Sequence, residues 1–197
     1  MFNHAARSIL GRSFARRSAS TIADIRARSH VLGGEAASPE VLKTFEIWHD
    51  AVAEMADRDS VSDGTIQAFR ECVDENVVFS PPTYFKPWEG RDEFMVLIEC
   101  VGEVFGPSFT YGRQWLSPCG REWALEFKAD IGDSGRSVDG IDLVSLDESG
   151  RIVDFKVLAR PPNAVAALKD AMMRKVPPRL AMMKAKQAVG GMGKLFA

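Results

Sequence analysis

The chain has 197 residues, of which 46% are hydrophobic, and its formal net charge is −2. This length suits one well-packed domain with tails rather than two domains. The charge is uneven: residues 1–34 hold six Arg and one Asp, residues 163–197 hold seven basic residues and one Asp, and the middle holds 12 basic and 25 acidic residues. An acidic body argues against a nucleic-acid groove on the domain, because phosphate binding needs a clustered positive surface.

The three cysteines, Cys72, Cys100 and Cys119, show no CxxC spacing. This pattern suggests neither a disulfide framework nor a zinc site, and we expect no metal and no cofactor. No apolar run approaches the roughly 18 to 20 residues that a membrane-spanning helix needs. The sequence therefore indicates a protein that is not transmembrane.

Residues 1–34 are rich in Arg, Ser and Ala, and Asp24 is their only acid. This composition is typical of a mitochondrial presequence, and the alternative is a disordered basic arm. We therefore predict a presequence or arm over residues 1–34, one domain over 35–175 and a basic, Met-rich extension over 176–197. The predicted localisation is mitochondrial, or cytoplasmic if the arm is not a targeting signal.

Three helices are predicted before the main run of strands. Ser38 is a good N-cap and Pro39 a good first helical residue, and apolar residues then recur every three or four positions to about Asp57. The same reasoning predicts a second helix from Asp63 to about Asn76 and a third over about 90–106. Gly-Pro ends the third helix.

Strand periodicity dominates the rest of the domain. A short strand over 77–82 is followed by a loop dense in aromatic residues, and apolar residues then alternate over 109–116, 122–131, 140–146 and 152–158. The last four segments predict an antiparallel meander. Helices beside a curved antiparallel sheet give an α+β cone with the sheet wrapped around the helices and an internal pocket.

Asp142 interrupts an apolar strand pattern. Period-two alternation places its side chain on the same face as Val144 and Leu146. If that face lines the pocket, burial disfavours the charged form, and Asp142 could give a hydrogen bond or a proton to a carbonyl oxygen. The alternative is a strand carboxylate paired with a neighbouring arginine such as Arg113. His49, beside the apolar stripe of the first helix, could be a catalytic base in the pocket or only a boundary histidine.

Aromatic residues could form the pocket wall. We predict a ligand pocket lined by Trp48, Phe79, Tyr84, Trp88, Arg113 and Trp115. Tyr84 and Trp88 are the stronger candidates because they come from a loop. The alternative is that the aromatic residues at strand spacing, Trp123 among them, are ordinary core.

The region from about residue 40 to 175 resembles the SnoaL-like branch of the nuclear transport factor two-like superfamily. Three segments carry the resemblance: VVFSPPTYFKPWEGRDEF, ALEFKADIG and GIDLVSLDESGRIVDFKVLARPPNAVAAL. The resemblance implies a cystatin-like α+β cone. The superfamily includes ketosteroid isomerase, polyketide cyclases, scytalone dehydratase and non-catalytic binding or assembly modules, so the fold alone leaves the function open.

The resemblance also implies a role for Asp142. GIDLVSL looks like the segment of ketosteroid isomerase that supplies a protonated Asp to the oxyanion hole, and Asp142 falls on that residue. Where the isomerase has its general base, this chain has Ser80, which is a poor proton acceptor at neutral pH. The complete isomerase mechanism is therefore not supported.

Two hypotheses follow. In the first, the domain binds a small apolar molecule and is a metal-free isomerase, cyclase or dehydratase with Asp142 as acid/base. In the second, it is a non-catalytic accessory subunit of a mitochondrial inner-membrane complex, of the respiratory chain or the ATP synthase, that uses the fold as an assembly scaffold.

Partners are also predicted from the ends of the chain. We expect a homodimer or a larger assembly. The C-terminal segment, broken by Pro177-Pro178, predicts two helices, and the basic segments at both ends suit a partner groove or an anionic membrane surface. The alternative for the C-terminal segment is a frayed, solvated tail.

Overall fold

One mixed sheet of six strands forms the framework of the fold. The computed structural model describes the backbone of residues 37–57 and 61–194. The strands follow the order β2-β1-β6-β5-β4-β3, and the sheet is not closed. They are β1 (Val73–Ser80), β2 (Trp88–Glu89), β3 (Thr110–Leu116), β4 (Glu122–Asp130), β5 (Ser137–Leu146) and β6 (Ile152–Arg160). The predicted antiparallel meander is confirmed for β3 to β6, whereas β1 runs parallel to β6.

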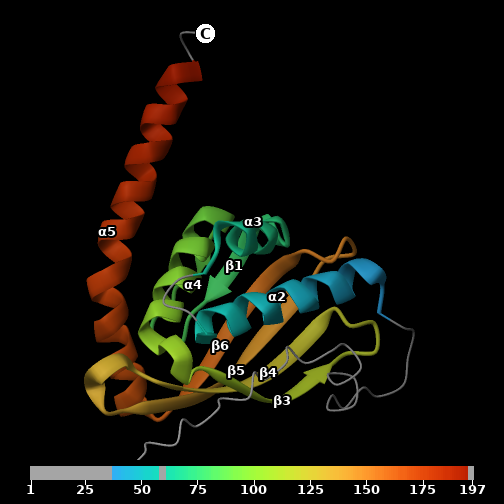
Figure 1. The fold of residues 1–197 in the computed structure, drawn as a ribbon, viewed down its shortest axis with the longest axis vertical. Helices are drawn as coiled ribbons and strands as arrows, with labels where there is room; N and C mark the ends of the chain where they lie inside the picture. Colours follow the sequence, from blue (N-terminus) through green and yellow to red (C-terminus); the bar gives the residue numbers. More distant parts are fainter. Residues whose placement is uncertain (1–36, 58–60, 195–197) are drawn as a thin grey trace, which may run out of the picture.

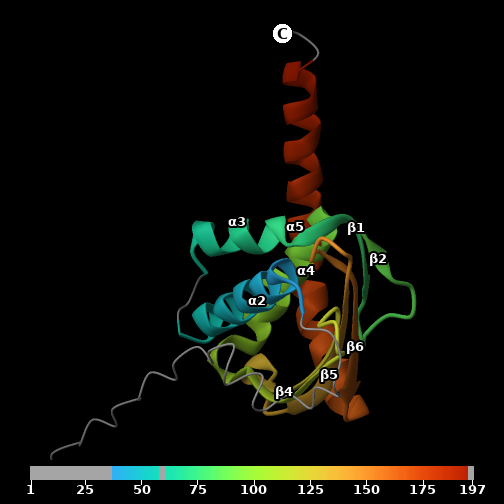
Figure 2. The same ribbon diagram turned by 90° about the vertical axis from the view of Figure 1, so that its right-hand side faces the viewer.

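Helices cover one side of this sheet. They are α2 (Pro39–Asp57), α3 (Asp63–Glu71) and α4 (Arg91–Phe105), and they lie together in Figures 1 and 2. α5 (Pro162–Lys194) packs beside α4 and then continues away from the rest of the molecule (Figure 1). The predicted α+β class is therefore confirmed. Within the described ranges, no helix has the length and apolar character needed to cross a membrane.

The second helix is shorter than predicted. α3 ends at Glu71, not near Asn76, and the chain enters β1 at Val73. The backbone N–H of Ile152 in β6 donates to the Cys72 carbonyl at 2.8 Å, and Val73 pairs with Ile152 in the parallel register. Pairing with a strand far along the sequence thus overrides the local helical pattern.

The C-terminal segment is one helix, which corrects the prediction of two. Pro177-Pro178 lies inside α5. The two carbonyls that lose an N–H donor belong to Met173 and Arg174, which are exposed, so water can satisfy them. Beyond the prolines, Arg179 pairs with Glu103 of α4 and holds the helix on the same course.

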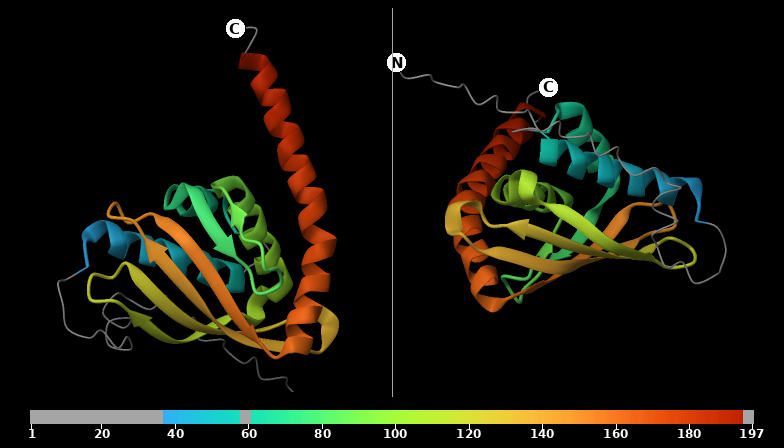
Figure 3. Two further views of the ribbon diagram at one scale, coloured as in Figure 1. Left: turned by 180° about the vertical axis from the view of Figure 1, so that it is seen from behind. Right: turned by 60° about the horizontal axis from the view of Figure 1, so that its bottom comes forward.

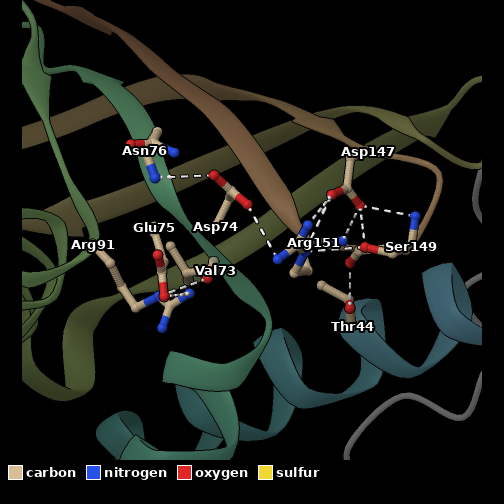
Figure 4. A network of polar contacts seen from close by, with 10 residues as sticks. Thr44, Val73, Asp74, Glu75, Asn76, Arg91, Asp147, Ser149 and Arg151 are labelled. Carbon is tan, nitrogen blue, oxygen red and sulfur yellow. Dashed lines mark hydrogen bonds and ion pairs between the residues drawn. The ribbon is translucent and has the colours of Figure 1, made fainter.

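A polar network fixes α2 to the turn between β5 and β6 (Figure 4). The Thr44 hydroxyl donates to the Gly150 carbonyl at 2.6 Å, and Gly150 has a left-handed φ of +78° that favours glycine. In the same turn, Arg151 lies 3.1 Å from Asp147 and 3.3 Å from Asp74 of β1. These contacts join the first helix to two neighbouring strands.

The core divides into two apolar clusters on the helical side of the sheet. The first is centred on aromatic residues of α2, α4, β1 and β6, namely Phe45, Trp48, Phe79, Phe94 and Phe155. The second lies toward the start of α5 and includes Phe105, Phe127, Ile131, Val138 and Leu168.

Candidate functional site

A cavity of about 350 Å³ lies where the two clusters meet, with walls from α2, α4, α5 and the sheet. Nearly all of its lining is apolar. The main apolar wall residues are Trp48, Phe79, Phe105, Phe127, Phe155 and Val157. In the part of the chain that the structure describes, Asp142 is the only carboxylate in the wall, and no Lys, Arg or His side chain lines it. The site therefore suits a neutral, apolar molecule that offers one polar group.

Asp142 lies in the middle of β5, as the strand pattern predicts. Its neighbours across the sheet are Leu125 and Val157, and its side chain is only 5% exposed, whereas the adjacent Leu143 faces outward. Burial raises the pKa of Asp142 from 3.8 to about 7, because no cation among the described residues compensates for the lost hydration. The predicted alternative, an ion pair with Arg113, is wrong.

A short chain of hydrogen bonds orients the Asp142 carboxyl. The Tyr111 hydroxyl donates to Asp142 Oδ2 at 3.0 Å, and Trp48 Nε1 donates to the Tyr111 oxygen at 2.8 Å. Burial raises the pKa of Tyr111 well above its ordinary value, and the nearby Asp142 charge adds to this effect. Tyr111 therefore remains a neutral donor, and no hydrogen bond from the described residues is made to Asp142 Oδ1.

Tyr111 was not among the predicted site residues. The alternation over residues 109–116 predicts that Tyr111 shares a strand face with Phe109, but a sequence pattern does not tell which side chain on another strand it meets. A tyrosine at an inward strand position was the available signal, since a buried phenol usually finds a hydrogen-bond partner.

His49 lies beside the cavity wall rather than in it. It is therefore not in the position that a catalytic base would need. Its Nδ1 is 2.8 Å from the Phe45 carbonyl oxygen and its Nε2 is 3.1 Å from Gln114 Oε1. Its ring packs on that of Phe45 with 4.1 Å between centroids. Burial lowers the pKa of His49, which favours the neutral ring. Because its ring packs on Phe45 and its nitrogens face Phe45 and Gln114 rather than the cavity, His49 is a packed boundary histidine.

The predicted pocket residues divide into two groups. Trp48, Phe79, Tyr84 and Trp88 line the cavity. Arg113 and Trp115 do not, and their predicted place in the wall is corrected.

A bulge in β3 explains why Arg113 and Trp115 do not line the cavity. Tyr111 pairs with Phe127 and Gln114 pairs with Leu125, so Gly112 and Arg113 together face one residue of β4. Such a bulge inverts the alternation, and the residues after it change face. Arg113 then lies on the outer face of the sheet, where its Nε is 2.9 Å from Glu126 Oε2.

Among the described residues, no second carboxylate, histidine, lysine or arginine lines the cavity opposite Asp142. Phe79 points into the cavity, so Ser80, its neighbour in β1, is turned away and is not part of the wall. The other polar side-chain groups of the described wall are the indole N–H groups of Trp48 and Trp88 and three hydroxyls, those of Thr83, Tyr84 and Tyr111. Among the described residues, no three or more His, Cys, Asp or Glu side chains are grouped to hold a metal ion.

Solved structures of other proteins share this architecture. A steroid delta-isomerase from Pseudomonas aeruginosa is 31% identical, with a TM-score of 0.63, over 75% of this chain and 99% of that chain. A bacterial protein with a cystatin-like fold from Silicibacter pomeroyi, described as uncharacterized, is 36% identical, with a TM-score of 0.56, over 73% of this chain and 97% of that chain. No protein-family model and no curated protein matches the sequence.

A third structure shows the fold alone. It is a protein from Jannaschia named as a SnoaL-like polyketide cyclase, 15% identical with a TM-score of 0.50 over 69% of this chain and 98% of that chain. The first two structures are more than 30% identical, and this chain spans nearly all of each. The chain therefore belongs to the nuclear transport factor two-like superfamily.

Proposed function

We propose that this chain binds a neutral, apolar carbonyl compound in the cavity and acts on it with Asp142 as acid/base. One observation carries the proposal: a single buried carboxyl, with a pKa of about 7, stands in an otherwise apolar wall and is oriented by Tyr111. A pKa near the working pH keeps both protonation states populated, as general acid–base catalysis requires.

The geometry supports a simple proton relocation. With Oδ2 held by Tyr111, the neutral Asp142 carboxyl donates its proton from Oδ1 to the ligand oxygen. The resulting carboxylate then takes a proton from a ligand carbon, so the carboxyl is regenerated and the ligand changes only in where its proton and double bond lie. This step is common to isomerase, cyclase and dehydratase chemistry, which are the reaction classes that we propose.

A steroid enone is the first compound to test, because one similar solved structure is named a steroid delta-isomerase. The assay follows the ultraviolet absorbance of the conjugated product when the purified chain is mixed with an unconjugated steroid ketone. Asp142→Asn is expected to abolish turnover while retaining binding, seen as quenching of tryptophan fluorescence.

Asp139→Asn is the matched control, because Asp139 is on the same strand but pairs with Arg160 outside the cavity. It is expected to leave turnover and binding unchanged. Equal turnover by Asp142→Asn and the wild type, or no binding of any apolar carbonyl compound, would contradict the proposal.

A second candidate is a non-catalytic accessory subunit of a mitochondrial inner-membrane complex, and the far part of α5 favours it. From Ala181 to Val189, every side chain except that of Met183 is exposed, and the helix extends beyond the sheet and the other helices (Figure 1). Residues 1–34, on which the predicted mitochondrial localisation depends, lie outside the described residues. Homodimerisation stays a prediction.

Two measurements test this candidate. A fusion of residues 1–34 to a fluorescent protein is expected to enter mitochondria, and native electrophoresis of mitochondrial extracts is expected to show the chain in a large complex. This candidate would be ruled out if the fusion protein stayed in the cytoplasm and the chain migrated alone.

A further inference from the structure

The cavity reaches solvent where the loop after β1, residues 81–87, meets α5. Three wall residues are exposed, and all lie at this junction: Tyr84, Met173 and Pro177. The Tyr84 hydroxyl donates to the Met173 sulfur at 2.6 Å, which joins the loop to the helix. Figure 3 shows the loop beside α5. We call this junction the mouth of the cavity.

The rim of the mouth is apolar and basic. Phe85 is 106% exposed, so its whole ring is presented to the surroundings. Tyr84, which precedes it in the loop, is 38% exposed, and Met173, which Tyr84 contacts, is 51% exposed. A single exposed apolar residue is ordinary, but several exposed apolar side chains grouped at the opening of an apolar cavity favour an interaction surface. Lys86 follows Phe85 in the loop, and Lys169 Nζ lies 5.4 Å from the centroid of the Tyr84 ring. These five residues form the mouth patch.

Of the two acids nearest in sequence, Glu89 points away from the mouth patch and Asp170 borders it. Glu89 follows Trp88 in β2, and because Trp88 lines the cavity, Glu89 lies on the opposite face of the strand. Asp170 is turned by about 100° from Lys169 around the axis of α5, but it lies three residues before Met173 and so stands at the edge of the patch. The mouth patch therefore combines exposed aromatic and thioether groups with two lysines. Exposed aromatic and thioether groups suit the interface of a bilayer, and each lysine near an anionic surface strengthens the attraction about fivefold.

We propose that the mouth patch docks on an anionic membrane surface, with Phe85 inserted among the lipids and Lys86 and Lys169 at the headgroups. The cavity then opens toward the bilayer, and a neutral apolar ligand enters it without crossing water. The membrane contact is independent of the chemistry proposed above, and only the route of the ligand rests on that function.

Sedimentation with vesicles tests the contact. The full chain is mixed with vesicles of phosphatidylcholine alone or of phosphatidylcholine with phosphatidylglycerol, and the bound fraction is measured. The wild type is expected to bind the mixed vesicles preferentially. Phe85→Ser is expected to lower the partition coefficient about tenfold or more, and Lys86→Glu and Lys169→Glu each by roughly fivefold or more. Phe85→Trp should preserve binding, since tryptophan suits the membrane interface.

Matched controls lie on the outer face of the sheet. Leu158→Ser removes an apolar side chain that is 56% exposed, and Lys128→Glu reverses an exposed charge, both away from the mouth. Neither should alter vesicle binding. Phe85→Ser should still bind a soluble apolar ligand when no vesicles are present. Loss of this binding would show that the substitution damages the cavity rather than the membrane contact.

Three results would overturn the proposal. One is a wild type that binds neither kind of vesicle. Another is equal binding by the wild type and the mouth variants, which would place the contact elsewhere, for example in the basic terminal segments. The third is a dimer that depends on Phe85 and forms without any vesicle binding, which would make the patch a contact between copies of this chain.

Discussion

Replacing Asp142 with Asn tests whether the cavity holds a carboxyl that resists ionisation. The substitution keeps the size of the side chain and an oxygen that can accept from Tyr111, but it removes the titration. Burial raises the pKa of Asp142 from 3.8 to about 7 in the folded protein. At about 1.4 kcal/mol per pKa unit, ionising Asp142 lowers the free energy of unfolding by about 4 kcal/mol.

The direction of the pH dependence follows from proton binding. The folded protein holds the Asp142 proton more tightly than the unfolded chain does, so its stabilising effect is complete below the unfolded pKa of 3.8 and is lost as the pH rises through about 7. The Asp142→Asn variant does not lose stability in this way, because its side chain does not ionise. Between about pH 5 and pH 9, its stability relative to the wild type should therefore increase by about 3 kcal/mol.

Urea denaturation of both proteins across this pH range measures the difference, and the other titrating groups largely cancel in the comparison. A difference that stays the same at every pH would mean that Asp142 ionises as it does in the unfolded chain. The reasoning that links burial in the apolar wall to a raised pKa would then be refuted.

Two further substitutions examine the surroundings of Asp142. Tyr111→Phe removes the hydrogen bond that lowers the pKa of Asp142, so the pH at which stability is lost should move upward in the same urea series; a downward movement would contradict the assigned hydrogen bond. Gly140→Ala would place a Cβ 2.3 Å from the Leu158 carbonyl oxygen and 2.7 Å from the Phe127 ring, and should lower the free energy of unfolding by about 1 to 3 kcal/mol. Unchanged stability of this variant in urea would show that β5 and β6 are less closely packed than the structure indicates.

The site is predictable from the sequence where a strand is regular. β5 alternates without interruption around Asp142, so counting residues from Val144 is enough to place the carboxyl on the inner face. In β3 the same counting fails, because the bulge at Gly112 and Arg113 depends on how β3 pairs with β4. Arg113 was therefore expected on the wrong face.

Contacts between distant segments explain the other features that the sequence does not predict. Nothing in the local pattern of β3 indicates that Tyr111 meets Asp142, 31 residues later in the chain. Likewise, Pro177-Pro178 predicts a break in a helix, whereas α5 continues because Arg179 is held by α4. Local patterns thus predict the fold class and the bounds of α2, α4 and β4 closely, whereas the start of β1, the end of α3 and the course of α5 depend on tertiary pairing.

The protonation state of Asp142 is the central claim, and its titration can be observed directly. In a chain with ¹³C-labelled aspartate carboxyls, the Asp142 signal is identified by its absence from the Asp142→Asn variant and followed by NMR as the pH is changed. We predict a pKa of about 7. A value near 3.8, that of an ordinary aspartate, would contradict both the buried acid and the chemistry proposed for it.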